Sequence, residues 1–265
     1  RLDVANIRRS CRIAEDTIYH LRDYIKPGIT TMELNERALI YIKKQGGTPA
    51  LKGYKGFPAA ICTSVNSIAA HGVPTQALRL KEGDLLTIDL TVSVDGWHGD
   101  IAWTFIVGGR DTEADNSHYH PHYKLINSAW QANIAGILAV KAGTHIGNIG
   151  WAINHAVEEK GHKIIKEYVG HGIGKQMHED PIIPNYGERG QGCRIVPGMV
   201  FTVEPLVNSG NSQTRVLDDG WSIETTDKSL TAQYEHTVAV FKDSIDILTI
   251  SKYKFKNFID KPPFI

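Results

Sequence analysis

The sequence contains little cysteine and no excess of charge of either sign. Only three of its 265 residues are cysteines (Cys11, Cys62 and Cys193), and no CxxC spacing occurs. This usage favours a reducing compartment over a disulfide scaffold and argues against a thiolate zinc site. Lysine plus arginine and aspartate plus glutamate both number 29, so no global charge recruits nucleic acid or an anionic membrane.

Long apolar runs are also missing. No stretch reaches the roughly 18 apolar residues of a membrane-spanning helix, and the N-terminal segment mixes charges into a helical pattern where a signal peptide would have an apolar core. We therefore expect a cytoplasmic protein that makes no membrane contact. The chain does not begin with methionine, so the question of what preceded Arg1 stays open. A hydrophobic content of 42% is typical of a globular chain.

The most informative segment present is TIDLTVSVDGWHGDIAWTF at residues 87–105. Alternating apolar residues around Asp95-Gly96 predict two antiparallel strands joined by a type I′ turn. In that register Thr91 lies opposite Asp100, and Asp89 shares their face. The two carboxylates would be about 7 to 8 Å apart at the backbone, within reach of one shared cation. An exposed hairpin, with both aspartates in water, is the alternative that this segment alone leaves open.

The order of helices and strands appears twice. Helices are expected at about residues 4–25, from Thr30 to about 46, at 126–140 and at about 149–160, with Thr30 and Glu33 spaced as a capping box. Strands are expected at 59–65, 85–94, 97–105, 199–207 and 232–241. The two units lie about 115 residues apart, which suggests an internal duplication around a shared core. Because the KPGITTMEL and KAGTHIGNI segments match only weakly, coincidence is the alternative.

We therefore predict one catalytic domain over residues 1–265. Its pseudo-repeats would span about 1–109 and 124–245, with a connector at 110–123 and a tail at 251–265. The connector contains His118, His120 and His122, which could hold a metal ion if they alternated along a strand. Pro121 interrupts such a strand, so a solvated loop is the preferred interpretation.

Three more candidate ligands lie in the second half. His171 stands in the glycine-rich VGHGIGKQMHED, Glu204 ends an apolar strand before a proline, and Glu235 lies within AQYEHTVAVF. Each alone has an ordinary structural explanation. With Asp89 and Asp100 they form a set of four carboxylates and one imidazole, which suits one or two divalent ions of the Mn, Fe or Co type, less selectively Zn. Two ions would activate a water, so the expected reaction class is metal-assisted hydrolysis.

Five segments together carry a resemblance that covers about residues 4–248. The hairpin at 87–105, YVGHGIGKQMHEDP, GMVFTVEP and TAQYEHTVAV resemble, in that order and spacing, the type I methionine aminopeptidases of peptidase family M24. ICTSVNSIAAHGVP, which precedes them in the chain, resembles the segment of this family that carries its first catalytic histidine. The resemblance implies the α+β pita-bread fold, in which two pseudo-symmetric halves share a central antiparallel β-sheet flanked by helices. This arrangement agrees with the duplication.

The resemblance also implies roles for individual residues. Asp89 would chelate one ion, Asp100 and Glu235 would bridge two, and His171 and Glu204 would complete the other ion's ligands. Glu204 would also handle the proton of the attacking water. His71 and His178 would contact the substrate beside the scissile bond, with His178 donating to the developing oxyanion. Whether Glu204 or His71 dominates proton transfer stays open.

The resemblance further implies an apolar pocket for methionine, with walls Tyr54, Phe57, Cys62, Met177 and Trp221. The family usually has an aromatic residue at Met177, and many bacterial members have cysteine at Leu51, so fine selectivity does not carry over. A monovalent cation site, for Na or K, would map to Asn66, Ile68 and Thr231. The divalent ions could be Co, Mn, Fe, Zn or Ni, since oxygen and imidazole ligands accept all of them.

The expected function is removal of the initiator methionine from nascent proteins whose second residue is small. Its partners would be nascent polypeptide N-termini and, transiently, the ribosome, and the enzyme would be a monomer. An X-Pro aminopeptidase or prolidase of the same fold is the nearest alternative, although such enzymes usually carry a further N-terminal domain. A non-catalytic pita-bread binding protein is disfavoured because all five ligand positions are intact.

Overall fold

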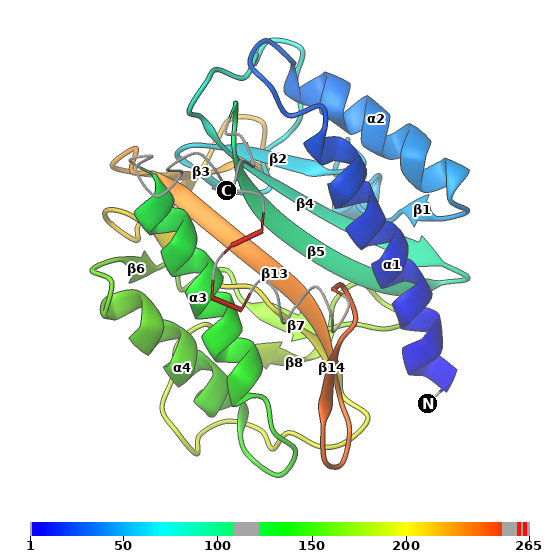
Figure 1. Cartoon of the computed structure of the whole chain (residues 1–265), viewed down its shortest axis with the longest axis vertical. Coiled ribbons are helices and arrows are strands. Elements are labelled where there is room, and N and C mark those ends of the chain that lie inside the picture. Colours follow the sequence, from blue (N-terminus) through cyan, green and yellow to red (C-terminus); the bar gives the residue numbers. More distant parts are fainter. Residues whose placement is uncertain (1, 109–121, 251–258, 261, 264–265) are drawn as a thin grey trace.

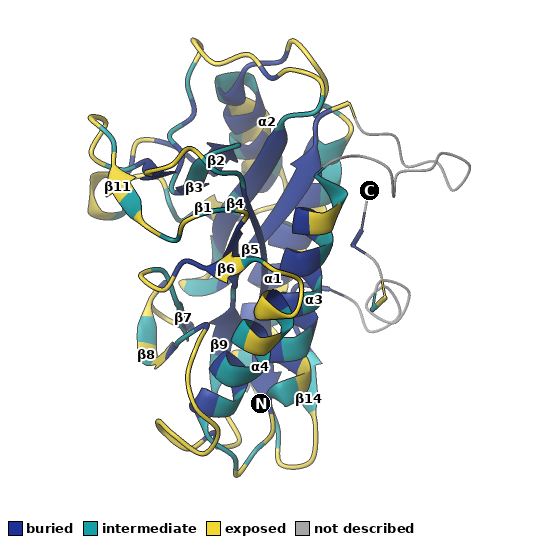
Figure 2. Ribbon diagram, turned by 90° about the vertical axis from the view of Figure 1, so that its left-hand side faces the viewer, coloured by how far each residue is buried: buried dark blue, intermediate teal, exposed yellow. Residues whose placement is uncertain are grey.

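Four helices lie on one side of a large antiparallel sheet (Figures 1 and 2). A computed structural model of the chain describes residues 2–108, 122–250, 259–260 and 262–263. Within them α1 packs on β4 and β5, and α3 packs on β13, while α2 contacts α1 and α4 contacts α3. The helices are α1 (Leu2–Arg22), α2 (Thr31–Lys44), α3 (Tyr123–Ala139) and α4 (Ile146–Glu158).

The main sheet follows the order β1-β4-β5-β13-β9-β7-β8, and β2, β6, β10 and β14 pair at its margins. A second sheet has the order β11-β12-β3. The strands are β1 (Thr48–Pro49), β2 (Cys62–Val65), β3 (Ile68–Ala70), β4 (Leu85–Val94), β5 (Trp97–Ile106), β6 (Lys163–Ile164), β7 (Gly170–Gly172), β8 (Glu179–Ile183), β9 (Val200–Val203), β10 (Leu206–Asn208), β11 (Thr214–Val216), β12 (Ile223–Thr225), β13 (Thr231–Val240) and β14 (Ile245–Ile247). A short 3₁₀ helix, η1, spans Tyr54–Gly56.

The β4–β5 hairpin forms in the predicted register. Val94 pairs with Trp97, and Thr91 pairs with Asp100. Asp95 and Gly96 both have positive φ, 53° and 76°, as a type I′ turn requires. The local sequence therefore determines both the hairpin and the face on which each side chain lies.

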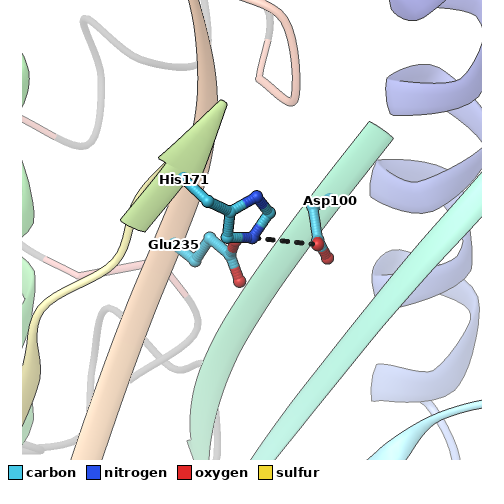
Figure 3. Close-up of side chains that lie close together, drawn as sticks. All are labelled: Asp100, His171 and Glu235. Atoms are coloured by element: carbon cyan, nitrogen blue, oxygen red, sulfur yellow. Dashed lines mark ion pairs between the residues drawn. The ribbon is translucent and has the colours of Figure 1, made fainter. Parts of the chain in front are cut away.

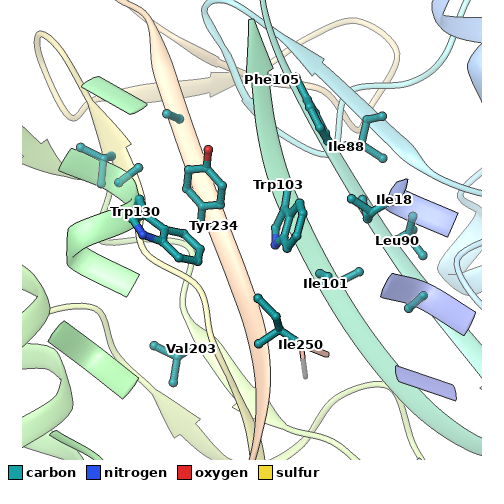
Figure 4. Close-up of a cluster of buried hydrophobic side chains, with 14 of the residues drawn as sticks. Ile18, Ile88, Leu90, Ile101, Trp103, Phe105, Trp130, Val203, Tyr234 and Ile250 are labelled. Carbon is teal, nitrogen blue, oxygen red and sulfur yellow. The ribbon is translucent and has the colours of Figure 1, made fainter. Parts of the chain in front are cut away.

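The main core fills the space between the sheet and the helices (Figure 4). On the helical side of the sheet, Trp103 of β5 makes an edge contact with Tyr19 of α1 at a centroid distance of 5.7 Å, and Tyr234 of β13 contacts Trp130 of α3 at 5.1 Å. Such aromatic pairs contribute beyond their buried area. Because strand side chains alternate, this packing directs the intervening residues to the opposite face.

Several element ends differ from the prediction. The first helix ends at Arg22 and not near Ile25, because the next backbone N–H groups, of Tyr24 and Ile25, bond to carbonyls three residues back, which tightens the last turn before Pro27. The expected strand at 199–207 is divided into β9 and β10. Pro205 has no N–H to donate to the ladder, so Glu204 stands at the break between the two strands. The capping box of Thr30 and Glu33 is confirmed in both directions.

Parts of the predicted connector and tail lie outside the described residues. His118 and His120 belong to that group, as do residues 251–258, while His122 directly precedes α3. None of the helices in the described part of the chain has the length and apolarity to cross a membrane.

Candidate metal centre and active site

Three acidic side chains share one face of three neighbouring strands. Asp89 of β4 lies opposite Ala102 of β5, which in turn lies opposite Glu235 of β13. Asp100 precedes Ala102 by two residues and therefore points to the same side. The small side chain of Ala102 leaves room between the carboxylates. This face is opposite to the one that Trp103 and Tyr234 bury against the helices.

His171 approaches this face from β7. Its Nδ1 lies 2.9 Å from the carbonyl oxygen of Gly172, which can only accept, so Nδ1 carries the proton and Nε2 offers a lone pair. Nε2 lies 3.6 Å from Glu204 Oε1 and 3.9 Å from Asp100 Oδ2. Ligand atoms of Asp100, His171 and Glu235 all lie within 4.8 Å of one another (Figure 3). A metal ion would fit at this point.

Glycine is required beside this histidine. A Cβ at Gly172 would lie 2.2 Å from the carbonyl oxygen of Asp180, closer than any contact that real side chains make. The glycine-rich sequence thus allows β7 to approach β8, which brings the imidazole over the acidic face.

Without a bound metal ion, the buried surroundings of these carboxyl groups disfavour their ionised forms. Burial raises the pKa of Asp89 to about 7. Burial, followed by the charge of the neighbouring carboxylates, also raises the pKa values of Asp100 and Glu235 well above their usual range. The pKa of Glu204 is likewise raised well above its usual range by burial, although Thr202 donates a 2.6 Å hydrogen bond to Oε1. Burial lowers the pKa of His171, so its imidazole is neutral, as a metal ligand must be.

The donor set fits a divalent cation. Among the ion pairs of the described residues, none joins a lysine or arginine to any of these four carboxylates. Buried carboxylates without a cation repel one another and are costly to desolvate. A divalent ion would offset both costs, and oxygen plus imidazole donors suit Mn, Fe, Co or Zn. The alternative of a water-exposed face for Asp100 is excluded, because this side chain is buried.

The acidic face forms one wall of a cavity of about 310 Å³. All of the predicted metal, catalytic and pocket residues line this single cavity: His71, His178, Glu204, Asp89, Asp100, His171, Glu235, Tyr54, Phe57, Cys62, Met177 and Trp221. The remaining predicted set, Asn66, Ile68 and Thr231, lies together but elsewhere. There the Thr231 hydroxyl donates to the backbone oxygens of Asn66 and Ile68, each at 3.1 Å.

Two histidines stand at the cavity beside the acidic face. His71 has a left-handed backbone, with φ 54°, and its ring makes an edge contact with Tyr168 at 5.7 Å. The His178 ring lies 4.1 Å from that of His171 between centroids, and its Nδ1 is 2.8 Å from the Tyr54 hydroxyl oxygen. Burial lowers the pKa of both, that of His178 to about 4. Both rings are therefore neutral near pH 7.

The apolar walls lie together on another side of the cavity. Phe57 makes an edge contact with Trp221 at 5.3 Å, and Cys62 packs in the same cluster. Burial, and then the charge of Asp89, raises the pKa of the Cys62 thiol well above its usual range. Cys62 therefore stays protonated and acts as a small apolar wall. Met177 is 3% exposed.

Sequence reasoning missed several residues that line the same cavity, namely Lys55, Ala70, Thr91, Glu167, Tyr168, Val169 and Gln233. For two of them the signal was present. Thr91 and Gln233 each lie two residues from a predicted carboxylate ligand, and therefore on the same face of its strand. Tyr168 comes from a loop and Lys55 from the short 3₁₀ helix η1, and no periodicity in the sequence indicates the position of either.

Proteins similar to this chain are metallopeptidases, as the geometry of the site suggests. The sequence model of metallopeptidase family M24 matches residues 5–242. Methionine aminopeptidase A of Synechocystis is 42% identical over 95% of this chain and 96% of its own length. The crystal structure of methionine aminopeptidase from Rickettsia prowazekii has a TM-score of 0.86 at 39% identity, covering 94% of this chain and 97% of that one.

A more distant solved structure shares the fold alone. Prolidase from Pyrococcus furiosus superimposes with a TM-score of 0.70 at 21% identity, over 95% of this chain and 65% of that one. The expected pita-bread fold is thus confirmed. The chain belongs to metallopeptidase family M24, and the relatives it matches over nearly their whole length are methionine aminopeptidases.

Proposed function

We propose that this protein removes N-terminal methionine from polypeptides whose second residue is small. The observation that carries the proposal is one cavity in which an acidic metal-binding face, two neutral histidines and an apolar wall meet. An apolar wall suits the unbranched side chain of methionine. The substrate's α-amino group and scissile carbonyl would then lie over the acidic face.

Two divalent ions would be held by this face. Asp89 would chelate one, Asp100 and Glu235 would bridge both, and His171 and Glu204 would complete the second. When bound, divalent ions polarise a carbonyl and lower the pKa of water. Because these donors accept several metals, the identity of the ions, whether Co, Mn, Fe, Zn or Ni, depends on supply as well as on the site.

The chain's own residues would perform the remaining steps. The Glu204 carboxylate would accept the proton of the attacking water, and its Oε1 is already oriented by Thr202. His178 would donate from Nε2 to the oxygen of the scissile carbonyl as negative charge develops there. His71 would contact the scissile amide and help the proton reach the leaving nitrogen. The walls Tyr54, Phe57, Cys62, Met177 and Trp221 would hold the first side chain and exclude water.

The test compares peptides and metals. Metal-stripped protein is reloaded with Mn or Co and incubated with Met-Ala-Ser, Met-Leu-Ser and an X-Pro peptide. We expect metal-dependent cleavage of Met-Ala-Ser and little of the other two. Equal cleavage of Met-Ala-Ser and Met-Leu-Ser, or cleavage without metal, would refute the proposal. Cleavage of the X-Pro peptide alone would instead assign prolidase-type activity.

We propose a single catalytic domain over residues 1–265, whose pseudo-repeats, about 1–109 and 124–245, each contribute a helix pair, α1–α2 and α3–α4, and metal ligands. It would act as a cytoplasmic monomer on nascent N-termini during brief contact with the ribosome. Co-sedimentation with ribosomes that carry nascent chains, compared with empty ribosomes, tests the last point.

A monovalent cation would bind at the backbone oxygens of Asn66 and Ile68 beside Thr231. Both oxygens are oriented towards the Thr231 hydroxyl, and carbonyl oxygens suit Na or K. Activity measured in potassium, sodium and a bulky organic cation at equal ionic strength tests this site. Equal activity and equal unfolding temperature in the three salts would refute the monovalent cation site.

A further inference from the structure

We infer that Tyr54 is a positioning residue for His178, whose Nε2-protonated tautomer it fixes through its hydroxyl group. This role differs from that of an apolar pocket wall. The inference rests on the proposed function, because it assigns a task to the histidine that would stabilise the reacting carbonyl.

The contact between the two side chains is specific. The Tyr54 hydroxyl oxygen lies 2.8 Å from His178 Nδ1, a normal length for a hydrogen bond between neutral groups. The rings are stacked at a centroid distance of 5.3 Å and an interplanar angle of 29°. The ring position of His178 is thus constrained by the stack and by the hydrogen bond together.

The direction of the hydrogen bond determines the chemistry. A neutral imidazole has one N–H and one lone pair. When the phenol O–H donates to Nδ1, the ring proton must be on Nε2. Nε2 has no hydrogen-bond partner among the residues that the structure describes, although His178 lines the cavity. A protonated Nε2 is a donor for a developing oxyanion, whereas the other tautomer would present a lone pair and repel it.

Tyr54 lies in a tight turn whose backbone conformation is unusual. Tyr54 begins η1, and Gly53, Lys55 and Gly56 all have left-handed backbones, with φ of 88°, 48° and 91°. For a lysine, which has a Cβ, this backbone conformation is strained. The turn is closed by the hydrogen bond from Gly53 N to Phe57 O at 2.8 Å.

The two partners belong to distant parts of the sequence. The turn of Tyr54 lies between β1 and β2, and His178 lies between β7 and β8. A strained turn in the first half therefore sets the tautomer of a histidine in the second half, across the cavity.

The decisive variant is Tyr54→Phe, which keeps the stacking ring and removes only the hydroxyl. For a Met-Ala-Ser substrate we expect kcat to fall roughly 10- to 100-fold, by analogy with the loss seen when the hydrogen-bond partner that orients a metal-bound histidine is removed. KM should stay within about threefold, because the apolar contact remains. Phe57→Leu is the matched control on the same wall: it should raise KM, with kcat less affected.

A double-mutant cycle tests whether Tyr54 acts through His178. If it does, Tyr54→Phe should cause little further loss of kcat in a His178→Ala background. An additive loss would show an independent role and overturn the inference. Equal unfolding temperatures and metal content of the single variants and the wild type would exclude a folding defect.

Nitrogen-15 NMR of the zinc-loaded protein reads the tautomer without substrate. The His178 resonances, assigned by their absence in His178→Ala, should show protonated Nε2 and unprotonated Nδ1 in the wild type. Tyr54→Phe should shift them towards a mixture. An Nδ1-protonated wild type, or unchanged spectra in the variant, would refute the inference. Failure of wild-type protein to cleave Met-Ala-Ser would instead refute the proposed function and leave this spectrum interpretable.

Discussion

At the scale of single residues, Asp100 occupies the central position of the acidic face. It is buried, lies 3.9 Å from His171 Nε2 and shares its face with Asp89 and Glu235. We expect Asp100→Asn to weaken binding of both ions and to lower activity by about 100-fold or more. Even the loss of a residue that only hydrogen-bonds to a metal ligand lowers metal affinity or activity by roughly 10- to 100-fold. Metal content and peptide cleavage are the measurements. The control is Asp95→Asn, an exposed change at the tip of the same hairpin, which should leave metal content and peptide cleavage unchanged. Full activity with two bound ions in Asp100→Asn would contradict the bridging role.

Asp89 gives a prediction about pH in the metal-free protein. Burial raises its pKa from 3.8 to about 7, so its protonated form stabilises the folded state, and this contribution is lost as pH rises towards 7. The side-chain amide of the Asp89→Asn variant cannot ionise. Between pH 5 and pH 7.5, metal-free Asp89→Asn should therefore gain on the order of 2 kcal/mol of unfolding free energy relative to wild type. Denaturant unfolding at the two pH values measures the difference.

Metal loading supplies the control for that comparison. Bound ions stabilise the ionised carboxylate, so the wild type should become the more stable protein at pH 7.5. A constant difference between the two metal-free proteins at both pH values would contradict a raised pKa at Asp89.

At the scale of elements, the packing of α1 on the β4–β5 hairpin depends on Gly99. A Cβ at Gly99 would lie 2.5 Å from the backbone nitrogen of Cys11 in α1. Gly99→Ala must displace the helix or the strand and should cost about 3 kcal/mol, as overpacking does. Gly96→Ala is the matched change at the turn. Its Cβ would have space, but the residue has a φ of +76°, so this change should cost about 1 kcal/mol. Chemical unfolding of both variants tests this order, and equal costs would contradict it.

At the scale of the whole molecule, the proposed ligands come from both halves of the chain. Asp89 and Asp100 belong to the first half, and His171, Glu204 and Glu235 to the second. A bound ion would therefore cross-link the halves and stabilise the fold. Metal at about 100 times its Kd adds about 2.7 kcal/mol, which for a chain of this size raises the unfolding temperature by roughly 5–10 °C.

Thermal unfolding before and after chelation measures this shift. The same chelation should change the unfolding temperature of Asp100→Asn by much less, which distinguishes loss of the site from a general effect of the chelator. An identical unfolding temperature for loaded and stripped wild type would show that no ion links the halves.

The sequence by itself determined the local features. Alternation of residues and the Asp95-Gly96 turn defined the β4–β5 register, and the spacing of Thr30 and Glu33 defined the start of α2, because these interactions join residues close in the chain. Five separate motifs were specific enough to indicate the family. The strand end at Glu204, before Pro205, was also predicted, but β10 was not separated from β9 and the first helix was extended to about Ile25 and not to Arg22, since element ends depend on single backbone groups.

Only the tertiary structure decided what the acidic residues face. The hairpin segment alone left Asp89 and Asp100 on either a wet surface or a metal site, because alternation shows which side chains share a face and not what covers that face. Pairing of β13 with β5, and the approach of β7, bring Glu235 and His171 to that face. The contact of Tyr54 with His178 arises in the same way, since it joins a turn and a loop that are 124 residues apart. The candidate metal centre and active site thus depend on contacts between residues far apart in the sequence, which no local sequence pattern encodes.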